Sequence, residues 1–426
     1  MLGEDAAGWI ARDADVVWHG FTQMSAYAEN EPLMVAAGEG RELIDVDGRR
    51  YLDAISSLWV NTLGHRVPEL DAAVRDQLDR IAHSTMLGNG NPAVVALSEA
   101  LASVVPVDRP HFLYASDGAT AVEQALKVAF QHWVNVGRPE RTGFLALAGA
   151  YHGDTVGALS LGDGGFGTDL FDPLRFPVRR APSVAAAADL VREHGPTLAA
   201  AVVEPLVQGA GGMLLHEPAD LADLAAACAD TGTLLICDEV ATGFGRTGTL
   251  FACEQAGVRP DLLVLGKGIT GGYLPMSATV ASHPVFASFL GPDLSAATLY
   301  HGHSYGGNAL AAAVASAHLA LFESSAVLAN VRARSDQLRG LLDERVAGLP
   351  GVSAIRLRGL MCGVELAPPA GGLRWGRRVS AHATRAGVLL RPLGDVVVLM
   401  PILTSTAGEI ERIVDALAGA IREVCG

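Results

Sequence analysis

Lysine is almost absent from this chain of 426 residues. Of its 31 basic residues only Lys127 and Lys267 are lysines, and the other 29 are arginines. A guanidinium stays protonated in proteins, whereas a lysine amine can lose its proton and attack a carbonyl. Any reaction that depends on an amine nucleophile therefore has only two side chains that can provide it.

Positive charge is scarce as well. The 46 acidic residues outnumber the basic ones, so the formal net charge is −15 and the isoelectric point is about 5.3. Such a surface repels phosphate backbones and anionic lipid, so neither nucleic acid nor a membrane is an expected partner. Charged residues make up 18% and hydrophobic residues 50% of the chain, which excludes a disordered protein. At about 100–200 residues per domain, the length predicts two or three packed units.

Paired cysteines and a targeting segment are also lacking. The five cysteines are scattered without a CxxC pair, so we expect neither a disulfide framework nor a metal site. The N-terminal sequence MLGEDAAGWIARDADVVW has no basic region followed by an apolar one, which favours a cytoplasmic protein. The longest apolar helical stretch, residues 309–322, is shorter than the ~20 residues of a membrane span and predicts a core helix.

Between about residues 60 and 320, short apolar runs alternate with helical periodicity. This pattern predicts an α/β fold in which helices cover a mostly parallel sheet. A polar residue follows the apolar part of each run, and parallel strands place such residues at one edge of the sheet, where ligands bind. The sequence therefore predicts a site there. The five expected strands are residues 111–116, 142–149, 198–205, 233–240 and 261–267.

The two ends of the chain follow other patterns. Residues 41–52 predict a hairpin, because Asp47-Gly48 supplies the positive φ that a tight turn requires. Four strand-like runs after residue 351 precede a helix over about 405–424. We therefore expect residues 1–60 to join a small α/β domain formed by 326–426, with a large cofactor-binding domain over 61–325.

The two lysines have different surroundings. Lys127 lies one helical turn after Glu123, an order that predicts a solvated surface pair. Lys267 ends an apolar strand and is followed by the glycine-rich GITGGYLP, which suggests an amine placed to form a Schiff base. Asp238 ends another strand and could hold the protonated ring nitrogen of pyridoxal 5'-phosphate, although a helix cap or an ion pair is an alternative role.

Two further motifs fit such a cofactor. Gly118 and Ala119 lie between a strand and a long helix, where backbone amides can bind a phosphate. Tyr151 follows another strand and could stack on a flat ring, although packing alone would also explain it.

These residues and their flanking motifs resemble the class III pyridoxal-phosphate aminotransferases of fold type I. The motifs extend over nearly the whole chain: SDGATAVEQALK, YHGDT, VEPLVQGAGG, CDEVATGFGRTG, PDLLVLGKGITGGYLPM and HGHSYGGN. The resemblance implies that Lys267 binds the cofactor and moves the proton, Asp238 binds the ring nitrogen, Gly118 and Ala119 bind the phosphate, and Tyr151 stacks on the ring. It also implies a homodimer with shared active sites, in which His303 and Ser304 contact the phosphate in the neighbouring copy.

Other segments resemble the branch of that class that converts 8-amino-7-oxononanoate to 7,8-diaminononanoate in biotin biosynthesis. They are WHGFTQM, DAISSLWVNTLGH, QLDRIAHSTMLG, AFQHW, MCGVEL and RPLGDVVVLMP. This resemblance implies a groove for an aliphatic chain and an arginine for its carboxylate. The substrate-binding residues that it implies are Phe21, Leu58, Trp59, Tyr151, Gly302 and Arg391.

The amino donor and the acceptor stay open. Phe21 replaces a tyrosine of many members of this branch, and Leu58 replaces the first of two tryptophans, so the donor is S-adenosylmethionine or lysine. One alternative is another class III ω-aminotransferase that acts on pyruvate or on a ketone or aldehyde of secondary metabolism. A second is a pyridoxal-phosphate-dependent aminomutase or a regulatory module that binds the cofactor.

Overall fold

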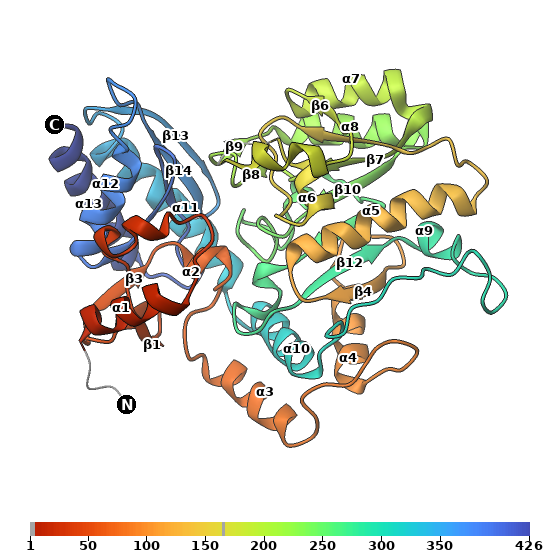
Figure 1. Ribbon diagram of the computed structural model, residues 1–426, viewed down its shortest axis with the longest axis horizontal. Helices are drawn as coiled ribbons and strands as arrows, with labels where there is room; N and C mark the ends of the chain where they lie inside the picture. The colour runs from red at the N-terminus through yellow and green to blue at the C-terminus, as the bar shows by residue number, and fades with distance from the viewer. Residues whose placement is uncertain (1–4, 164–166) are drawn as a thin grey trace.

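A seven-stranded sheet forms the core of the larger part of the molecule, on the right in Figure 1. The computed structural model describes residues 5–163 and 167–426. The strand order is β4-β12-β11-β10-β7-β5-β6, and every neighbouring pair is parallel except the two that include β12. The predicted α/β fold with a mostly parallel sheet is therefore confirmed. In sheet order the strands span His111–Ala115, Ser277–Ala281, Leu262–Leu265, Leu234–Asp238, Leu198–Val203, Gly143–Leu147 and Arg179–Ala181.

Both faces of this sheet are buried. In β11, Leu262 and Val264 pack in one apolar cluster with helix α5, whereas Leu263 and Leu265 pack in a second cluster with helix α8. Alternate residues of a strand point to opposite faces, so a continuous apolar run is what a sheet covered on both sides requires. The helices of this part are α3 (Pro68–Leu78), α4 (Pro92–Ala102), α5 (Gly118–Asn135), α6 (Val156–Leu161), α7 (Val184–His194), α8 (Pro218–Thr231), α9 (His283–Ala287) and α10 (Ala309–Ser324).

The parallel strands end at one edge of the sheet, as the sequence predicts. β4, β5, β7, β10 and β11 run in one direction, so the residues that follow them meet at that edge. These residues include Asp117, Tyr151, Glu204, Asp238 and Lys267.

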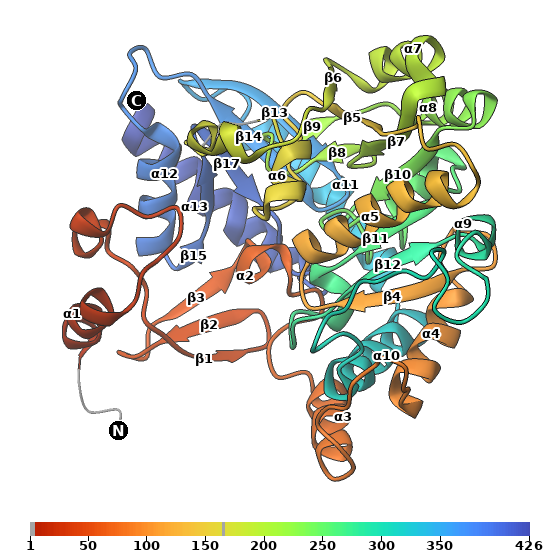
Figure 2. The same cartoon turned by 45° about the vertical axis from the view of Figure 1, so that its right-hand side comes forward.

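Away from the central sheet, one four-stranded sheet combines the two ends of the chain (Figure 2). β2 (Glu42–Asp45) and β3 (Arg50–Asp53) form the predicted hairpin, and Gly48 in its turn has φ +83°. β3 pairs in parallel with the late strand β15 (Val388–Leu389). The first sheet also contains β1 (Val35–Glu39), and a second consists of β13 (Val352–Arg358), β14 (Met361–Leu366), β17 (Val396–Leu399) and β16 (Arg391–Leu393).

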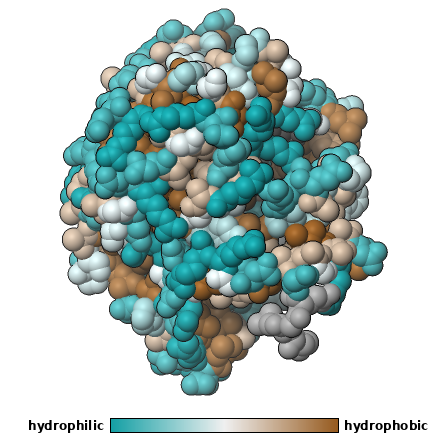
Figure 3. All heavy atoms as spheres, turned by 90° about the vertical axis from the view of Figure 1, so that its left-hand side faces the viewer, coloured by the Kyte–Doolittle hydropathy of each residue, from teal (hydrophilic) through white to brown (hydrophobic). Residues whose placement is uncertain are grey.

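Helices cover these sheets on the outside. They are α1 (Ala6–Val16), α11 (Val327–Arg345), α12 (Trp375–Arg385) and α13 (Ala407–Cys425), and a short α2 (Ser56–Trp59) follows β3. α13 buries Ile410, Ile413 and Leu417 on its inner side, and the face of the molecule on this side is mainly hydrophilic (Figure 3). The domain boundaries after residues 60 and 325 stay a prediction, and residues 1–4 of the predicted N-terminal segment lie outside the described residues.

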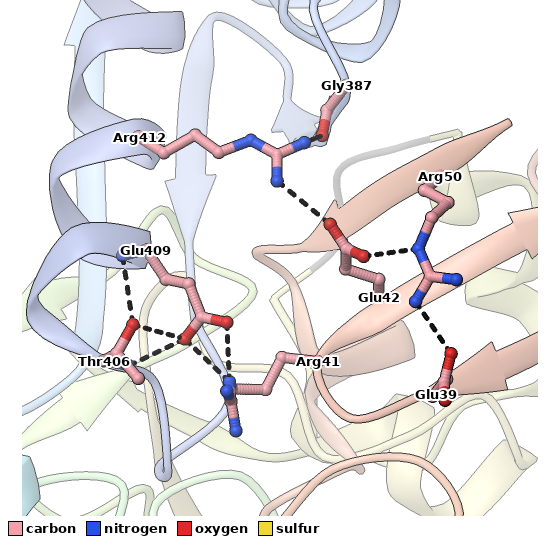
Figure 4. A network of polar contacts seen from close by, with 8 residues as sticks. All are labelled: Glu39, Arg41, Glu42, Arg50, Gly387, Thr406, Glu409 and Arg412. Carbon is pink, nitrogen blue, oxygen red and sulfur yellow. Dashed lines mark hydrogen bonds and ion pairs between the residues drawn. The ribbon is translucent and has the colours of Figure 1, made fainter.

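Ion pairs tie the N-terminal hairpin to α13 (Figure 4). Arg41 donates from Nε to both carboxylate oxygens of Glu409, at 2.8 and 2.7 Å. Glu409 also completes a capping box with Thr406 at the start of α13. Glu42 accepts hydrogen bonds from Arg50 and from Arg412 of α13. Side chains far apart in the sequence therefore fix the start of the last helix against the first sheet.

The apolar stretch at residues 309–322 lies in α10 and belongs to the core, as predicted, and even His318 in its middle is fully buried. Among the described residues no single helix is both long and apolar enough to cross a membrane. Only α10 and α11 together meet that test, and they are bent by 69° at their junction. The five cysteines have free thiols, and four of them are buried.

Candidate functional site

Lys267 lies where β11 ends, directly after Gly266, and has a positive φ of 41°. Its Nζ lies 5.3 Å from the centre of the Trp59 ring and makes no hydrogen bond or ion pair within the described part of the chain. Burial lowers the pKa of Lys267 below its usual 10.5, and the nearby charge of Arg246 adds to this effect, although Asp238 and Glu204 oppose it. Burial thus disfavours the charged form of the amine, which has no competing hydrogen-bond partner among the described residues.

Asp238 is the last residue of β10 and is buried. Its Oδ1 accepts a hydrogen bond from the Val240 amide at 3.0 Å, and its Oδ2 pairs with His152 Nδ1 at 2.7 Å. Burial opposes protonation of His152, but the hydrogen bond to Asp238 and the charges of Asp238 and Glu204 outweigh it and raise the pKa of His152. The pair fixes the orientation of the carboxylate at the sheet edge and leaves it able to accept further hydrogen bonds.

Glu204 is one of the polar residues at the ends of the predicted strands, but the sequence prediction gave it no role. It follows β7, is buried, and accepts hydrogen bonds from the Tyr151 amide (3.1 Å) and the Gly209 amide (2.9 Å). Burial raises the pKa of Glu204 to about 7, and Asp238 adds to the shift while His152 opposes it. The signal for both Glu204 and His152 was present, since each is a polar residue that follows an apolar strand.

The N-terminus of α5 lies against the end of β11. Asp117 caps the helix by accepting from the Thr120 amide, while the first amides of the helix have no partner within it. A Cβ on Gly118 would lie 2.7 Å from Val240 Cγ1, and a Cβ on Gly266 would lie 3.4 Å from Gly118 Cα. Only glycine allows this approach, so the sequence brings the helix amides of Gly118 and Ala119 beside the strand that carries Lys267.

A cavity of about 160 Å³ is lined in part by Tyr151. Phe21, Tyr151 and Asp154 contribute to its wall, and the Tyr151 hydroxyl donates to Asp154 Oδ2 at 2.9 Å. Burial, together with Asp154, raises the pKa of Tyr151, so its hydroxyl is neutral at ordinary pH. The structure therefore places Phe21 and Tyr151 together, as the sequence suggests for substrate-binding residues.

The Ser56–Trp59 segment that carries Leu58 and Trp59 has an unusual backbone. All four residues have a positive φ, between 50° and 123°, and such a conformation costs on the order of 1–3 kcal/mol per residue. Asp53 holds the turn by accepting from both the amide and the hydroxyl of Ser57, at 2.9 and 2.7 Å. As a result Trp59 is buried beside Lys267, whereas Leu58 is 42% exposed.

Arg246 holds the same turn by hydrogen bonds. It was not among the predicted site residues. Its guanidinium donates to Ser56 Oγ (3.0 Å), to the Asn61 carbonyl (2.7 Å) and to the Pro401 carbonyl (3.1 Å). Burial lowers the pKa of Arg246 to about 9, and Asp53 opposes the shift. Sequence patterns do not reveal such a role, because the three acceptors come from distant parts of the chain.

The remaining predicted residues contact other groups. His303 Nδ1 accepts from the Tyr305 amide, the Ser304 carbonyl accepts from His83, and Gly302 lies against Leu87. These contacts do not connect the three residues with Lys267 in the same copy of the chain. Ser304 is exposed, and its hydroxyl has no partner within residues 5–163 and 167–426.

Arg391 is the first residue of the edge strand β16 and is half-buried. Burial lowers the pKa of Arg391, and its guanidinium forms no hydrogen bond or ion pair with any described residue. A half-buried guanidinium without a carboxylate partner is suited to bind one from a ligand.

The predicted Lys127–Glu123 pair is wrong. Glu123 instead accepts hydrogen bonds from Thr155 Oγ1 and from the Gly157 and Ala158 amides, at the start of α6. Three fixed donors at a helix N-terminus hold a carboxylate better than one mobile ammonium group in water. Lys127 Nζ lies 3.0 Å from His301 Nδ1.

The chain resembles known proteins over nearly its whole length. Residues 24–421 match a family model described as Aminotransferase class-III. The chain is 46% identical to the adenosylmethionine-8-amino-7-oxononanoate aminotransferase of Nitratidesulfovibrio vulgaris, over 96% of this chain and 80% of that protein.

Two solved structures extend the comparison. The adenosylmethionine-8-amino-7-oxononanoate aminotransferase of Methanocaldococcus jannaschii superposes with a TM-score of 0.94 and 37% identity, over 98% of this chain and 99% of that one. An amine transaminase from an uncultivated Pseudomonas species in its PLP-bound form gives a TM-score of 0.88 and 33% identity, over 96% and 99% of the two chains.

Proposed function

This chain belongs to the class III aminotransferases, and from that membership we propose that it uses pyridoxal 5'-phosphate to aminate 8-amino-7-oxononanoate to 7,8-diaminononanoate, a step of biotin biosynthesis. The amino donor is S-adenosylmethionine or lysine. One observation carries the proposal: the Lys267 amine has no hydrogen-bond partner in the described part of the chain, burial lowers its pKa, and it lies near the oriented carboxylate of Asp238.

The residues at the sheet edge fit this cofactor. The Lys267 amine has no other partner, His152 Nε2 is a buried polar atom without a partner among the described residues, and side chains at Gly118 and Gly266 would obstruct the approach of α5. When bound, pyridoxal 5'-phosphate accepts and returns the amino group and stabilises the electron pair left when a proton leaves the substrate carbon. Lys267 would hold it, Asp238 would keep its ring nitrogen protonated, the amides of Gly118 and Ala119 would bind its phosphate, and Tyr151 would stack on its ring.

Lys267 also moves the proton. Its Nζ takes a proton from the carbon that bears the donor amine and returns one to the carbon that receives the amine in the acceptor. An amine with the usual pKa of 10.5 would be protonated at neutral pH and unable to act, so the lowered pKa of Lys267 is what this role requires. The buried Trp59 excludes water from one side of Nζ.

The acceptor has an aliphatic chain and a carboxylate. The side chains of Phe21, Leu58 and Trp59 provide apolar surface for the chain. The unpaired, half-buried guanidinium of Arg391 would bind the carboxylate through two parallel hydrogen bonds. Tyr151 would contact both the cofactor and the substrate.

Absorbance of the holoenzyme tests the donor half of the reaction. Addition of S-adenosylmethionine or lysine should remove the absorbance of the Lys267-bound cofactor, and 8-amino-7-oxononanoate should restore it. Lys267→Ala should reduce turnover by at least about 10²–10⁴-fold, because the proton has no other carrier. Lys267→Arg, which keeps the charge but not the deprotonable amine, should fail equally. Normal repeated turnover by either variant would refute the assignment.

A second candidate is another class III ω-aminotransferase, and the similarity to a solved amine transaminase favours it. Comparison of acceptors decides between the two. If kcat/KM for pyruvate or a simple ketone exceeds that for 8-amino-7-oxononanoate, the biotin reaction is excluded while transamination stands. A holoenzyme whose absorbance responds to no donor would instead indicate an aminomutase or a regulatory module.

We further propose a homodimer with shared active sites. Ser304 is exposed, and its hydroxyl has no partner among the described residues of its own copy. Exposed apolar side chains lie on the segments around it, such as Leu87, Leu294, Tyr300 and Tyr305. In this arrangement His303 and Ser304 contact the phosphate bound to the neighbouring copy. Sedimentation equilibrium should show twice the chain mass, and a monomer with full activity would refute shared sites.

A further inference from the structure

The chain between α9 and α10 is an extended loop. From Ser288 to Asn308 it forms no helix or strand, although all of it lies within the described residues. Loops longer than about 12–15 residues without secondary structure are uncommon in compact domains and usually have a function. Both ends of this loop are held by polar side chains from other elements.

One face of α5 holds the first half of the loop. Lys127, Gln131 and Asn135 follow each other at intervals of four residues and therefore line one side of the helix. Gln131 Nε2 donates to the carbonyls of residues 296, 297 and 298, at 3.4, 3.3 and 3.1 Å. Asn135 Nδ2 donates to the carbonyl of residue 297 at 3.3 Å. We call these three side chains the α5 clamp.

Lys127 completes the clamp at His301. An ammonium group can only donate, so His301 Nδ1 is the acceptor in the 3.0 Å contact and the ring proton resides on Nε2. Burial lowers the pKa of His301, and the charges of Lys127 and His303 lower it further, so the neutral ring that this contact needs is favoured. The contact fixes the chain two residues before His303.

The second half of the loop is held by the segment between α3 and α4. His83 Nε2 pairs with the Ser304 carbonyl at 2.8 Å, and Asn91 Nδ2 donates to the Gly307 carbonyl at 3.1 Å. The backbone is thus held on both sides of His303 and Ser304, while the Ser304 hydroxyl keeps its hydrogen-bonding capacity. Such an arrangement is expected where a side chain must meet a ligand outside its own copy.

We propose that Lys127, Gln131 and Asn135 are positioning residues that hold the loop so that His303 and Ser304 reach the phosphate of the cofactor bound to a second copy of the chain. This inference rests on the proposed shared-site dimer. α5 then acts at both sites: its N-terminal amides bind the phosphate of its own copy, and its clamp positions the loop for the partner. The second lysine of the chain thereby also acts on the reaction, although it touches neither substrate nor cofactor.

Hybrid dimers test this inference. The clamp variant Lys127→Met/Gln131→Ala/Asn135→Ala should bind pyridoxal 5'-phosphate on the order of tenfold more weakly in an absorbance titration of the cofactor-free chain, because the loop that carries His303 and Ser304 is no longer held in place. A hybrid of one clamp-variant copy and one Lys267→Ala copy is isolated with two affinity tags. Only its clamp-variant copy keeps Lys267, so the hybrid has one complete site. That site receives its loop from the Lys267→Ala copy, so it should bind the cofactor with wild-type affinity and be active.

The outcomes separate the alternatives. A hybrid with the weak affinity of the clamp variant would show that the clamp acts within its own copy and would overturn the inference, as would a clamp variant with wild-type affinity. If the triple variant does not fold, Gln131→Ala alone enters the same hybrid, with the same two readings. Gln337→Ala is the matched control, because Gln337 Nε2 also donates to a backbone carbonyl, that of Ala407, but far from the loop. A monomer with Lys267-dependent activity would refute the shared sites and the inference while leaving the aminotransferase proposal intact.

Discussion

At the residue scale, the site depends on titratable groups whose pKa values are shifted by burial. Burial lowers the pKa of Lys267, although the nearby carboxylates of Asp238 and Glu204 favour its charged form. The carboxylates oppose this shift less than two unpaired ionised groups would, because Asp238 pairs with His152 and the pKa of Glu204 is raised to about 7.

Arg391 provides a test of the acceptor site. Arg391→Ala should raise KM for 8-amino-7-oxononanoate by about 10–100-fold, because hydrogen bonds between charged groups contribute about 1.5–3 kcal/mol. The rate of the first half-reaction, measured by absorbance with lysine as the donor, should change little if lysine does not use Arg391. Arg334→Ala on α11 is the matched control, since Arg334 hydrogen-bonds Gln337 away from the site. An unchanged KM in Arg391→Ala would contradict this role.

Glu204 gives stability a pH dependence with a defined sign. In the cofactor-free protein its pKa is raised from 4.5 to about 7, so between these values the folded state keeps a proton that the unfolded state releases. Folding is therefore favoured at low pH by on the order of 3 kcal/mol from this group, and that contribution is lost as pH rises toward 7.

Glu204→Gln should flatten this part of the curve. Urea denaturation at several pH values between 4.5 and 7 should show a smaller decline of the free energy of unfolding in the variant, even though its absolute stability falls. Some decline should persist, because burial also raises the pKa of Glu239, to about 6. Glu69→Gln, at an exposed position of α3, should leave the decline unchanged. A curve for Glu204→Gln parallel to that of the unmodified protein would contradict the shift.

At the element scale, the close approach of Gly118 to Val240 fixes the position of the N-terminus of α5. Gly118→Ala places a Cβ 2.7 Å from Val240 Cγ1, so the helix N-terminus must move and its amides lose their alignment. We expect cofactor affinity to fall on the order of tenfold, which corresponds to about 1.4 kcal/mol. Absorbance titration of the cofactor-free protein measures it.

Gly340→Ala is the control for this helix substitution. Gly340 lies in the interior of α11 with open space around the added Cβ, so alanine should leave cofactor affinity unchanged and stabilise the protein by up to about 1 kcal/mol. Equal affinity in Gly118→Ala and Gly340→Ala would show that the approach of α5 to Val240 is not needed for cofactor binding.

The elements that the sequence predicted are those with long apolar runs, such as β7 and β10, and α13 with its apolar residues at helical spacing. β12 and β6 were not predicted. β12 consists of small residues, SATVA, and β6 is only three residues long with two arginines, so neither has an apolar pattern of its own. Both are strands because neighbouring strands supply hydrogen-bond partners.

At the scale of the whole molecule, the two ends of the chain stabilise each other. Arg41 and Glu409 are separated by 368 residues, and the Arg41 Nε–H is shared between both carboxylate oxygens in a contact that is about three-quarters buried at both side chains. Burial would raise the pKa of Glu409, but hydrogen bonds from Arg41 and Thr406 outweigh it and hold the pKa below 4.5. The contact therefore contributes at neutral pH and is lost as Glu409 is protonated in acid.

A double-mutant cycle measures this coupling. Arg41→Met and Glu409→Gln should show an interaction free energy of about 1 kcal/mol at pH 7, which shrinks as the pH falls below 4.5 and as salt is added. Arg50 and Glu39 form an exposed pair in the same network and serve as the control, with a smaller coupling. Additive effects of the Arg41 and Glu409 substitutions at pH 7 would contradict a stabilising role for the contact.

The sequence by itself predicted most of the strands and helices, the edge of the sheet at which polar residues meet, and Lys267 rather than Lys127 as the candidate amine. Local patterns suffice for these, because apolar periodicity and glycines act over a few residues. The tertiary structure decided which polar groups meet: His152 with Asp238, Arg246 with the Ser56–Trp59 turn, and Lys127 with His301 rather than Glu123. Such partners are brought together by the fold across tens to hundreds of residues, and their burial sets their pKa values, so no pattern of neighbours along the chain encodes them.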